Sequence, residues 1–107
     1  MNFKCILAMV KPHLTDQVVE AAKKAGATGA TSMPAKGTGI HEAKTFFGLT
    51  LDIPTDIVLF LLTDSLVDPV LTAVAEAGRF KEPGTGIAFV VPVDRVAGLE
   101  SQLKNQD

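Results

Sequence analysis

The chain has 107 residues, 47% of them hydrophobic, and a net charge of −2 without any run of lysine or arginine. These values predict one folded domain over residues 1–107, exclude a disordered chain, and argue against a nucleic-acid-binding surface. Tyrosine is absent, which excludes regulation by tyrosine modification. The lone Cys5, the lack of an apolar run of about 18 residues and the lack of a leader pattern predict a cytoplasmic protein without membrane insertion.

The first third of the chain predicts a strand, a helix and a second strand. Residues 3–10 are almost entirely apolar, as expected of a buried central strand. Thr15 is the expected N-cap of the following helix, and Gly26 is expected to end it. The apolar stripe of this helix consists of Val18, Ala21, Ala22 and Ala25. A second strand is expected over residues 29–35.

Residues 36–54 have no clear hydrophobic period. A structureless connection of about 19 residues is unusually long for a compact domain, and such segments are commonly functional. We therefore expect this segment to carry part of the protein's activity.

The second half repeats the pattern of the first. An apolar strand is expected over residues 57–62, and Ser65 with Asp68 resembles a helix-capping signal. A fourth strand is predicted over residues 87–93, and a short helix over residues 94–103. The stripe of the second helix consists of Val67, Val70, Leu71, Val74 and Ala77.

This order predicts an α+β fold of the ferredoxin-like βαββαβ type. Right-handed crossovers would produce an antiparallel sheet with both helices on one face. The expected strands are apolar on both of their faces, so the uncovered face of the sheet cannot remain in water. Homo-oligomerisation through the sheet is therefore expected.

Four segments, taken in order, resemble the PII signalling family. They are residues 9–18, residues 25–31, the Gly37-x-Gly39 spacing, and residues 84–90. Together they extend over nearly the whole chain. The resemblance implies a homotrimer whose sheets face a central core, a cleft between neighbouring subunits that binds adenine nucleotides, and a loop, here residues 36–54, that reaches partner proteins.

The resemblance also implies which residues bind a ligand. Met9, Thr31 and Leu61 match positions that line the family's adenine pocket, although core packing explains Met9 and Leu61 slightly better. Two Gly-Thr-Gly turns match the turns that hold the phosphates, and backbone N–H groups in such turns can bind anions. The alternative is that these glycines simply turn the chain. The matching residues of the turns are Gly37, Gly39, Gly84, Thr85 and Gly86.

Where the family carries cations that contact phosphate, this chain has none. Because ATP carries about four negative charges and each unpaired charge costs several kcal/mol, this disfavours ATP. AMP, ADP or bicarbonate is easier to accommodate, as is no ligand at all. The positions that have lost the family's positive charge are Ile40, Thr55, Ile87, Gly98 and Glu100. The nearby cations, predicted to be solvated surface charges, are Lys36, Arg79, Lys81 and Arg95.

The long segment is the expected partner-binding loop. Its apolar residues would either dock a partner or fold back onto the trimer, and the chain shows no spacing typical of a metal site. The candidate contact residues are His41, Glu42, Lys44, Phe46, Phe47 and Leu49.

The resemblance implies a non-enzymatic regulator of a partner, expected to be a membrane transporter for inorganic carbon or another ion. The alternative is an orthodox PII nitrogen sensor that binds ATP and 2-oxoglutarate. An enzyme is a third hypothesis, but the sequence contains no recognisable pair of nucleophile and base. A trimer whose cleft has no ligand is a fourth.

Overall fold

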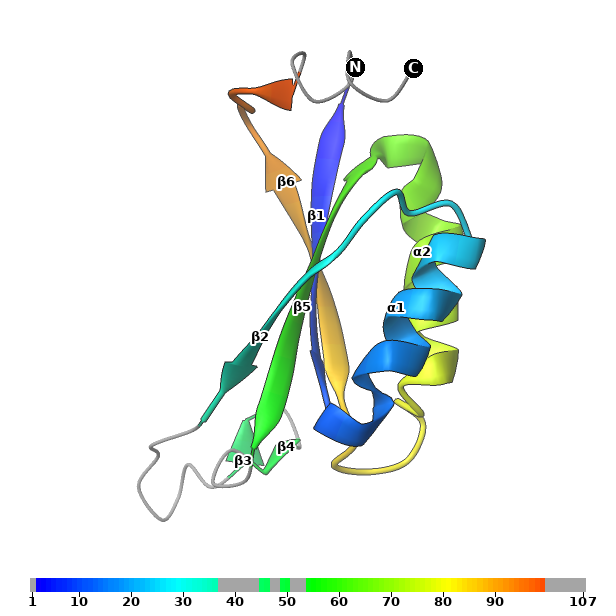
Figure 1. Ribbon diagram of the computed structural model, residues 1–107, viewed down its shortest axis with the longest axis vertical. Coiled ribbons are helices and arrows are strands. Elements are labelled where there is room, and N and C mark those ends of the chain that lie inside the picture. Colours follow the sequence, from blue (N-terminus) through cyan, green and yellow to red (C-terminus); the bar gives the residue numbers. More distant parts are fainter. Residues whose placement is uncertain (1, 37–44, 47–48, 51–53, 100–107) are drawn as a thin grey trace.

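A computed structural model describes residues 2–36, 45–46, 49–50 and 54–99 (Figure 1). Its main elements alternate strand and helix in the predicted order. They are β1 (Phe3–Val10), η1 (Pro12–Leu14), α1 (Thr15–Lys24), β2 (Thr31–Ala35), β5 (Thr55–Thr63), η3 (Asp64–Leu66), α2 (Val67–Ala77) and β6 (Ile87–Val93). Two short strands, β3 (Thr45–Phe46) and β4 (Leu49–Thr50), lie within the long segment.

The four long strands form one sheet in the order β2-β5-β1-β6, and all neighbours are antiparallel. Both helices cover the same face of this sheet (Figure 1). This arrangement confirms the predicted ferredoxin-like βαββαβ fold. The predicted bounds of β1 and β6 are also confirmed, whereas β2 begins at Thr31 rather than at residue 29.

The core lies between the sheet and the two helices. Alternate residues of β1 and β5 point into it, and Phe60 is its largest fully buried side chain. Helix α2 contributes the apolar stripe that its sequence predicts, whereas in α1 Val19 packs against the core and the predicted Ala21 does not. The main core residues are Ile6, Ala8, Val10, Val18, Ala22, Val58, Phe60, Leu62, Val70 and Val74.

The predicted N-terminal caps of the helices are wrong. A 3-10 turn precedes each helix, so the N-cap residues are Leu14 and Leu66, and neither makes a side-chain cap hydrogen bond. Thr15 is buried and donates its hydroxyl hydrogen to Asp56 Oδ2 at 2.6 Å, which ties the start of α1 to the start of β5. Gly26 does end α1, with φ of +123°, a backbone conformation that favours glycine.

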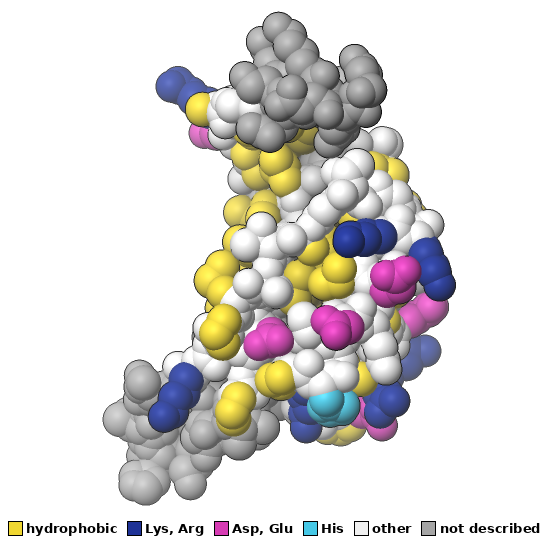
Figure 2. All heavy atoms as spheres, viewed as in Figure 1, with side chains coloured by type: hydrophobic (Ala, Val, Ile, Leu, Met, Phe, Trp, Pro, Cys, Tyr) yellow, Lys and Arg dark blue, Asp and Glu magenta, His cyan; other side chains and the backbone are white. Residues whose placement is uncertain are grey.

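The opposite face of the sheet is apolar as well. Directly paired residues of antiparallel strands lie on the same face, so the pairing places Leu7, Leu59 and Phe89 in one row. A neighbouring row holds Met9, Ile57 and Ile87. Figure 2 shows hydrophobic side chains along the side of the molecule away from the helices, with charged side chains mainly over the helices. We call this surface the open sheet face.

Residues 94–98 do not form the predicted helix over residues 94–103, whereas Leu99 is helical, and residues 100–103 lie outside the described part of the chain. The long segment is not wholly irregular, because Phe46 pairs with Leu49 in the short β3–β4 ladder.

Candidate ligand-binding site

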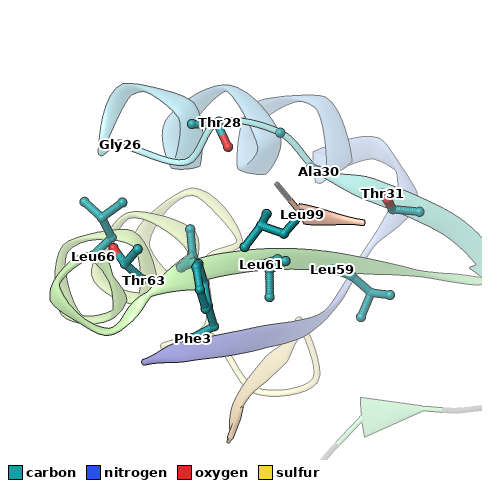
Figure 3. A pocket seen from close by; sticks show the side chains of 12 residues that line it. Phe3, Gly26, Thr28, Ala30, Thr31, Leu59, Leu61, Thr63, Leu66 and Leu99 are labelled. Atoms are coloured by element: carbon teal, nitrogen blue, oxygen red, sulfur yellow. The ribbon is translucent and has the colours of Figure 1, made fainter. Parts of the chain in front are cut away.

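A cavity of about 630 Å³ lies beside β5, between that strand and the chain that connects α1 to β2 (Figure 3). Its volume is within the usual range of small-molecule sites. Two of the predicted ligand residues, Thr31 and Leu61, line it. The complete lining consists of Phe3, Gly26, Thr28, Gly29, Ala30, Thr31, Leu59, Leu61, Leu62, Thr63, Leu66 and Leu99.

The cavity exists because β2 is shorter than β5. Pairing between them runs only from Thr31 opposite Leu59 to Ala35 opposite Thr55. Residues 60–63 of β5 therefore extend beyond the start of β2. Residues 26–30 pass along this part of β5 without pairing with it, and the cavity lies between them.

Met9 lies on the same face of the sheet as Thr31 and Leu59 but does not line the cavity. It pairs with Ile57, whereas Thr31 pairs with Leu59, two residues further along β5. Because a strand rises about 3.4 Å per residue, Met9 lies about 7 Å along the sheet from the row that contains Thr31. Met9 instead adjoins the second glycine turn, where its carbonyl oxygen would be 2.6 Å from a Cβ on Gly86.

The second glycine turn is held together by its own contacts. Gly84 has φ of +77°, so its backbone requires glycine, whereas Gly86 provides space for the ring of Phe80. The Thr85 hydroxyl donates to the carbonyl oxygen of Glu82 at 2.7 Å and is also within bonding distance of that of Arg79. The hydroxyl hydrogen of Thr85 is thus directed into the turn.

The two glycine turns leave the same end of the sheet from opposite edges. The first follows β2, and the second precedes β6. Gly37 and Gly39 lie outside the described residues, but Ala35 at the end of β2 marks where the first turn departs. Three strand spacings of about 4.8 Å separate β2 from β6, or about 14 Å. Within one chain, the end of β2 and the start of β6 therefore lie on opposite edges of the sheet.

No charged side chain belongs to the described lining of the cavity. Three of the positions at which the family carries a cation are described. Thr55 lies in β5, Ile87 lies in β6, and Gly98 follows β6. The four nearby cations are exposed, and Arg79 and Lys81 border a separate hollow beside Glu76 on α2. In its described part, the cavity offers aliphatic surface and threonine hydroxyls but no positive charge.

Most of the predicted partner-binding residues lie outside the described part of the chain, namely His41, Glu42, Lys44 and Phe47. Phe46 and Leu49 are described only as the paired residues of β3 and β4.

Sequence reasoning missed several lining residues. Thr28 lies within residues 25–31, which resemble the PII family. This resemblance is the signal that could have identified Thr28 as a lining residue. Phe3 was assigned to the strand core, and Leu99 to a helix over residues 94–103, of which only Leu99 is helical among the described residues. No local pattern marks either as a cavity residue, because the fold brings them there from opposite ends of the chain.

The comparisons with known proteins agree with the fold. The family model described as "Nitrogen regulatory protein P-II" matches residues 3–102. The nitrogen regulatory protein P-II of Azospirillum brasilense is 30% identical over 109 residues, covering 97% of each chain. The nitrogen fixation nifHD region GlnB-like protein 1 of Methanothermobacter marburgensis is 27% identical, covering 85% of this chain and 88% of that protein.

Among solved structures, that of Arabidopsis thaliana PII bound to citrate superposes with a TM-score of 0.73 and 26% identity. It covers 94% of this chain and 85% of the other. Within the described residues, no helix is long and apolar enough to cross a membrane.

Proposed function

Because this chain belongs to the P-II family of regulatory proteins, we propose that it is a cytoplasmic homotrimeric regulator of a membrane transporter. Its ligand is a phosphate-poor nucleotide or a small anion, bound at the β5 cavity and the glycine turns. Its partner is engaged by residues 36–54. The observation that carries the proposal is the match to the P-II family over residues 3–102 together with a cavity that has no charged residue in its described lining.

The open sheet face supports the trimer. Its rows of Leu, Met, Ile and Phe residues would be expensive to leave in water, since each buried aliphatic or aromatic side chain contributes about 1.5–3 kcal/mol. Leu61 and Val91 on this face are 40% and 43% exposed in the single chain. A second copy would cover these side chains and also bring a β2 edge close to a neighbouring β6 edge. This completes a site that uses both glycine turns.

The lining favours a ligand with little charge. Placing a triphosphate beside aliphatic surface costs several kcal/mol for each unpaired charge. Threonine hydroxyls, such as those of Thr28 and Thr31, can hydrogen-bond a heterocycle or an anion without a formal charge. AMP, ADP or bicarbonate therefore fits the cavity better than ATP with magnesium.

Calorimetric titration of the purified protein with AMP, ADP, ATP and bicarbonate tests this choice. We expect AMP or bicarbonate to bind, ATP to bind no more tightly than AMP, and magnesium to have no effect. Thr31→Val, which removes one hydroxyl at nearly constant volume, should weaken binding about fivefold. Thr72→Val, on the exposed face of α2, is the matched control and should change nothing. Tight magnesium-dependent ATP binding, strengthened by 2-oxoglutarate, would instead identify an orthodox nitrogen sensor.

The transporter partner is tested by sedimentation with membranes of the source organism. We expect the wild-type chain to sediment with these membranes, and a Phe46→Ser, Phe47→Ser double variant to remain in solution. Val96→Ser, an exposed valine outside the long segment, should sediment like the wild type. Equal sedimentation with protein-free liposomes contradicts a transporter partner. A failure to sediment with the membranes, both with and without AMP and bicarbonate, contradicts it as well.

A further inference from the structure

The chain after β6 returns one side chain to the cavity. Residues 94–98 are all exposed, whereas Leu99 is partly buried and belongs to the lining. Figure 3 shows Leu99 among the lining residues, next to Leu61 and below the segment that carries Ala30. The segment from 94 to 99 thus places one aliphatic side chain in a cavity otherwise formed by β1, β2, β5, η3 and the chain between α1 and β2.

Gly98 explains how the segment reaches this position. Its φ of +89° lies in the region where a side chain is strained, while a Cβ there would meet no atom within 4 Å. Glycine is therefore needed at this point for its backbone conformation and not for space. The turn at Gly98 brings Leu99 into the cavity.

We propose that Leu99 determines the ligand selectivity of the cavity by occupying part of its volume. This inference rests on the proposed ligand function of the same cavity. The remaining lining belongs to β1, β2, β5, η3 and the connection that follows α1. Residues 94–98, which lead to Leu99, are exposed and without regular structure, so a ligand can displace Leu99 from the cavity. A ligand with a flat ring must compete with Leu99 for the surface of Leu61.

The first test is calorimetric titration with adenosine, an uncharged probe. We expect Leu99→Ala to lower the Kd for adenosine by about tenfold, since a few methyl-sized groups in an apolar pocket change affinity by this order. Leu99→Trp should raise the Kd by a similar factor. Gly98→Ala, which strains the turn, should act in the same direction as Leu99→Ala. Val96→Ala, in the same segment but outside the lining, is the matched control and should change the Kd by less than about twofold.

A second measurement does not depend on any ligand. In the free protein, NMR of labelled methyl groups should show cross-relaxation between Leu99 and Leu61. Its absence overturns the proposal whatever the titrations show.

The titrations separate the two proposals. Adenosine binding by Leu99→Ala but not by the wild type supports the role of Leu99 and removes the proposed nucleotide ligand. Equal binding by the wild type, Leu99→Ala and Val96→Ala keeps that ligand and overturns the role of Leu99. Binding by none of these variants overturns the role of Leu99 and removes a nucleotide as the ligand, which leaves bicarbonate.

Discussion

At the scale of single residues, Phe80 organises the second glycine turn. Arg79 ends α2 in a left-handed conformation, with φ of +57°, and the Phe80 N–H donates to the carbonyl oxygen of Ala75 at 3.0 Å. This is the hydrogen bond of a Schellman motif. It sets the Phe80 ring against Gly78 and Gly86, where a Cβ on either glycine would overlap the ring. The turn is thus shaped by packing, whatever ligand its backbone also contacts.

Gly86→Ala is therefore expected to destabilise the fold by about 3 kcal/mol, at the upper end of the usual cost of overpacking. The added Cβ would be 2.6 Å from the carbonyl oxygen of Met9, which cannot move without disturbing the pairing of β1. Denaturant unfolding of both proteins at one protein concentration measures the difference.

Gly29→Ala is the control for that measurement. A Cβ added at Gly29 would have no atom within 4 Å, so the added methyl group meets open space. We expect its free energy of unfolding to change by less than about 1 kcal/mol. If both substitutions destabilised the protein equally, the tight approach of Phe80 and Met9 would not be what requires glycine at position 86.

At the scale of elements, the sequence predicts strands better than helix starts. Residues 3–10 and 87–93 are apolar and end at clear breaks, so both strands were predicted with their observed bounds. Thr15 was predicted to cap α1 because local patterns alone were available. Its actual partner, Asp56, is 41 residues away, and a hydrogen bond of that range leaves no local signal.

In the candidate site as well, some residues could be predicted from the sequence and others could not. Thr31 and Leu61 could be proposed from the family resemblance, and both line the cavity. The cavity itself depends on β2 starting at Thr31 instead of two residues earlier, and strand ends are the least predictable part of an element. Phe3 and Leu99 come from the two ends of the described chain, so only the folded structure brings them to one place.

At the scale of the whole molecule, the two faces of the sheet have different partners. The helices of the same chain cover one face, whereas the described residues leave the other face partly exposed. An apolar sheet face of this size marks an interaction surface. The P-II membership makes a further copy of this chain the expected cover.

A charge on the open sheet face should therefore dissociate the trimer. Val91 pairs with Cys5 on that face and is 43% exposed in the single chain. Its neighbour Val90 points to the helix side and is 39% exposed. A carboxylate at either position stays solvated in a monomer, but Val91→Glu would bury it between copies at a cost of several kcal/mol. Light scattering should give three times the 11.3 kDa of one chain for the wild type and for Val90→Glu, and the mass of one chain for Val91→Glu. A wild-type monomer would refute the trimer, and equal dissociation by both substitutions would show that the open sheet face is not the interface.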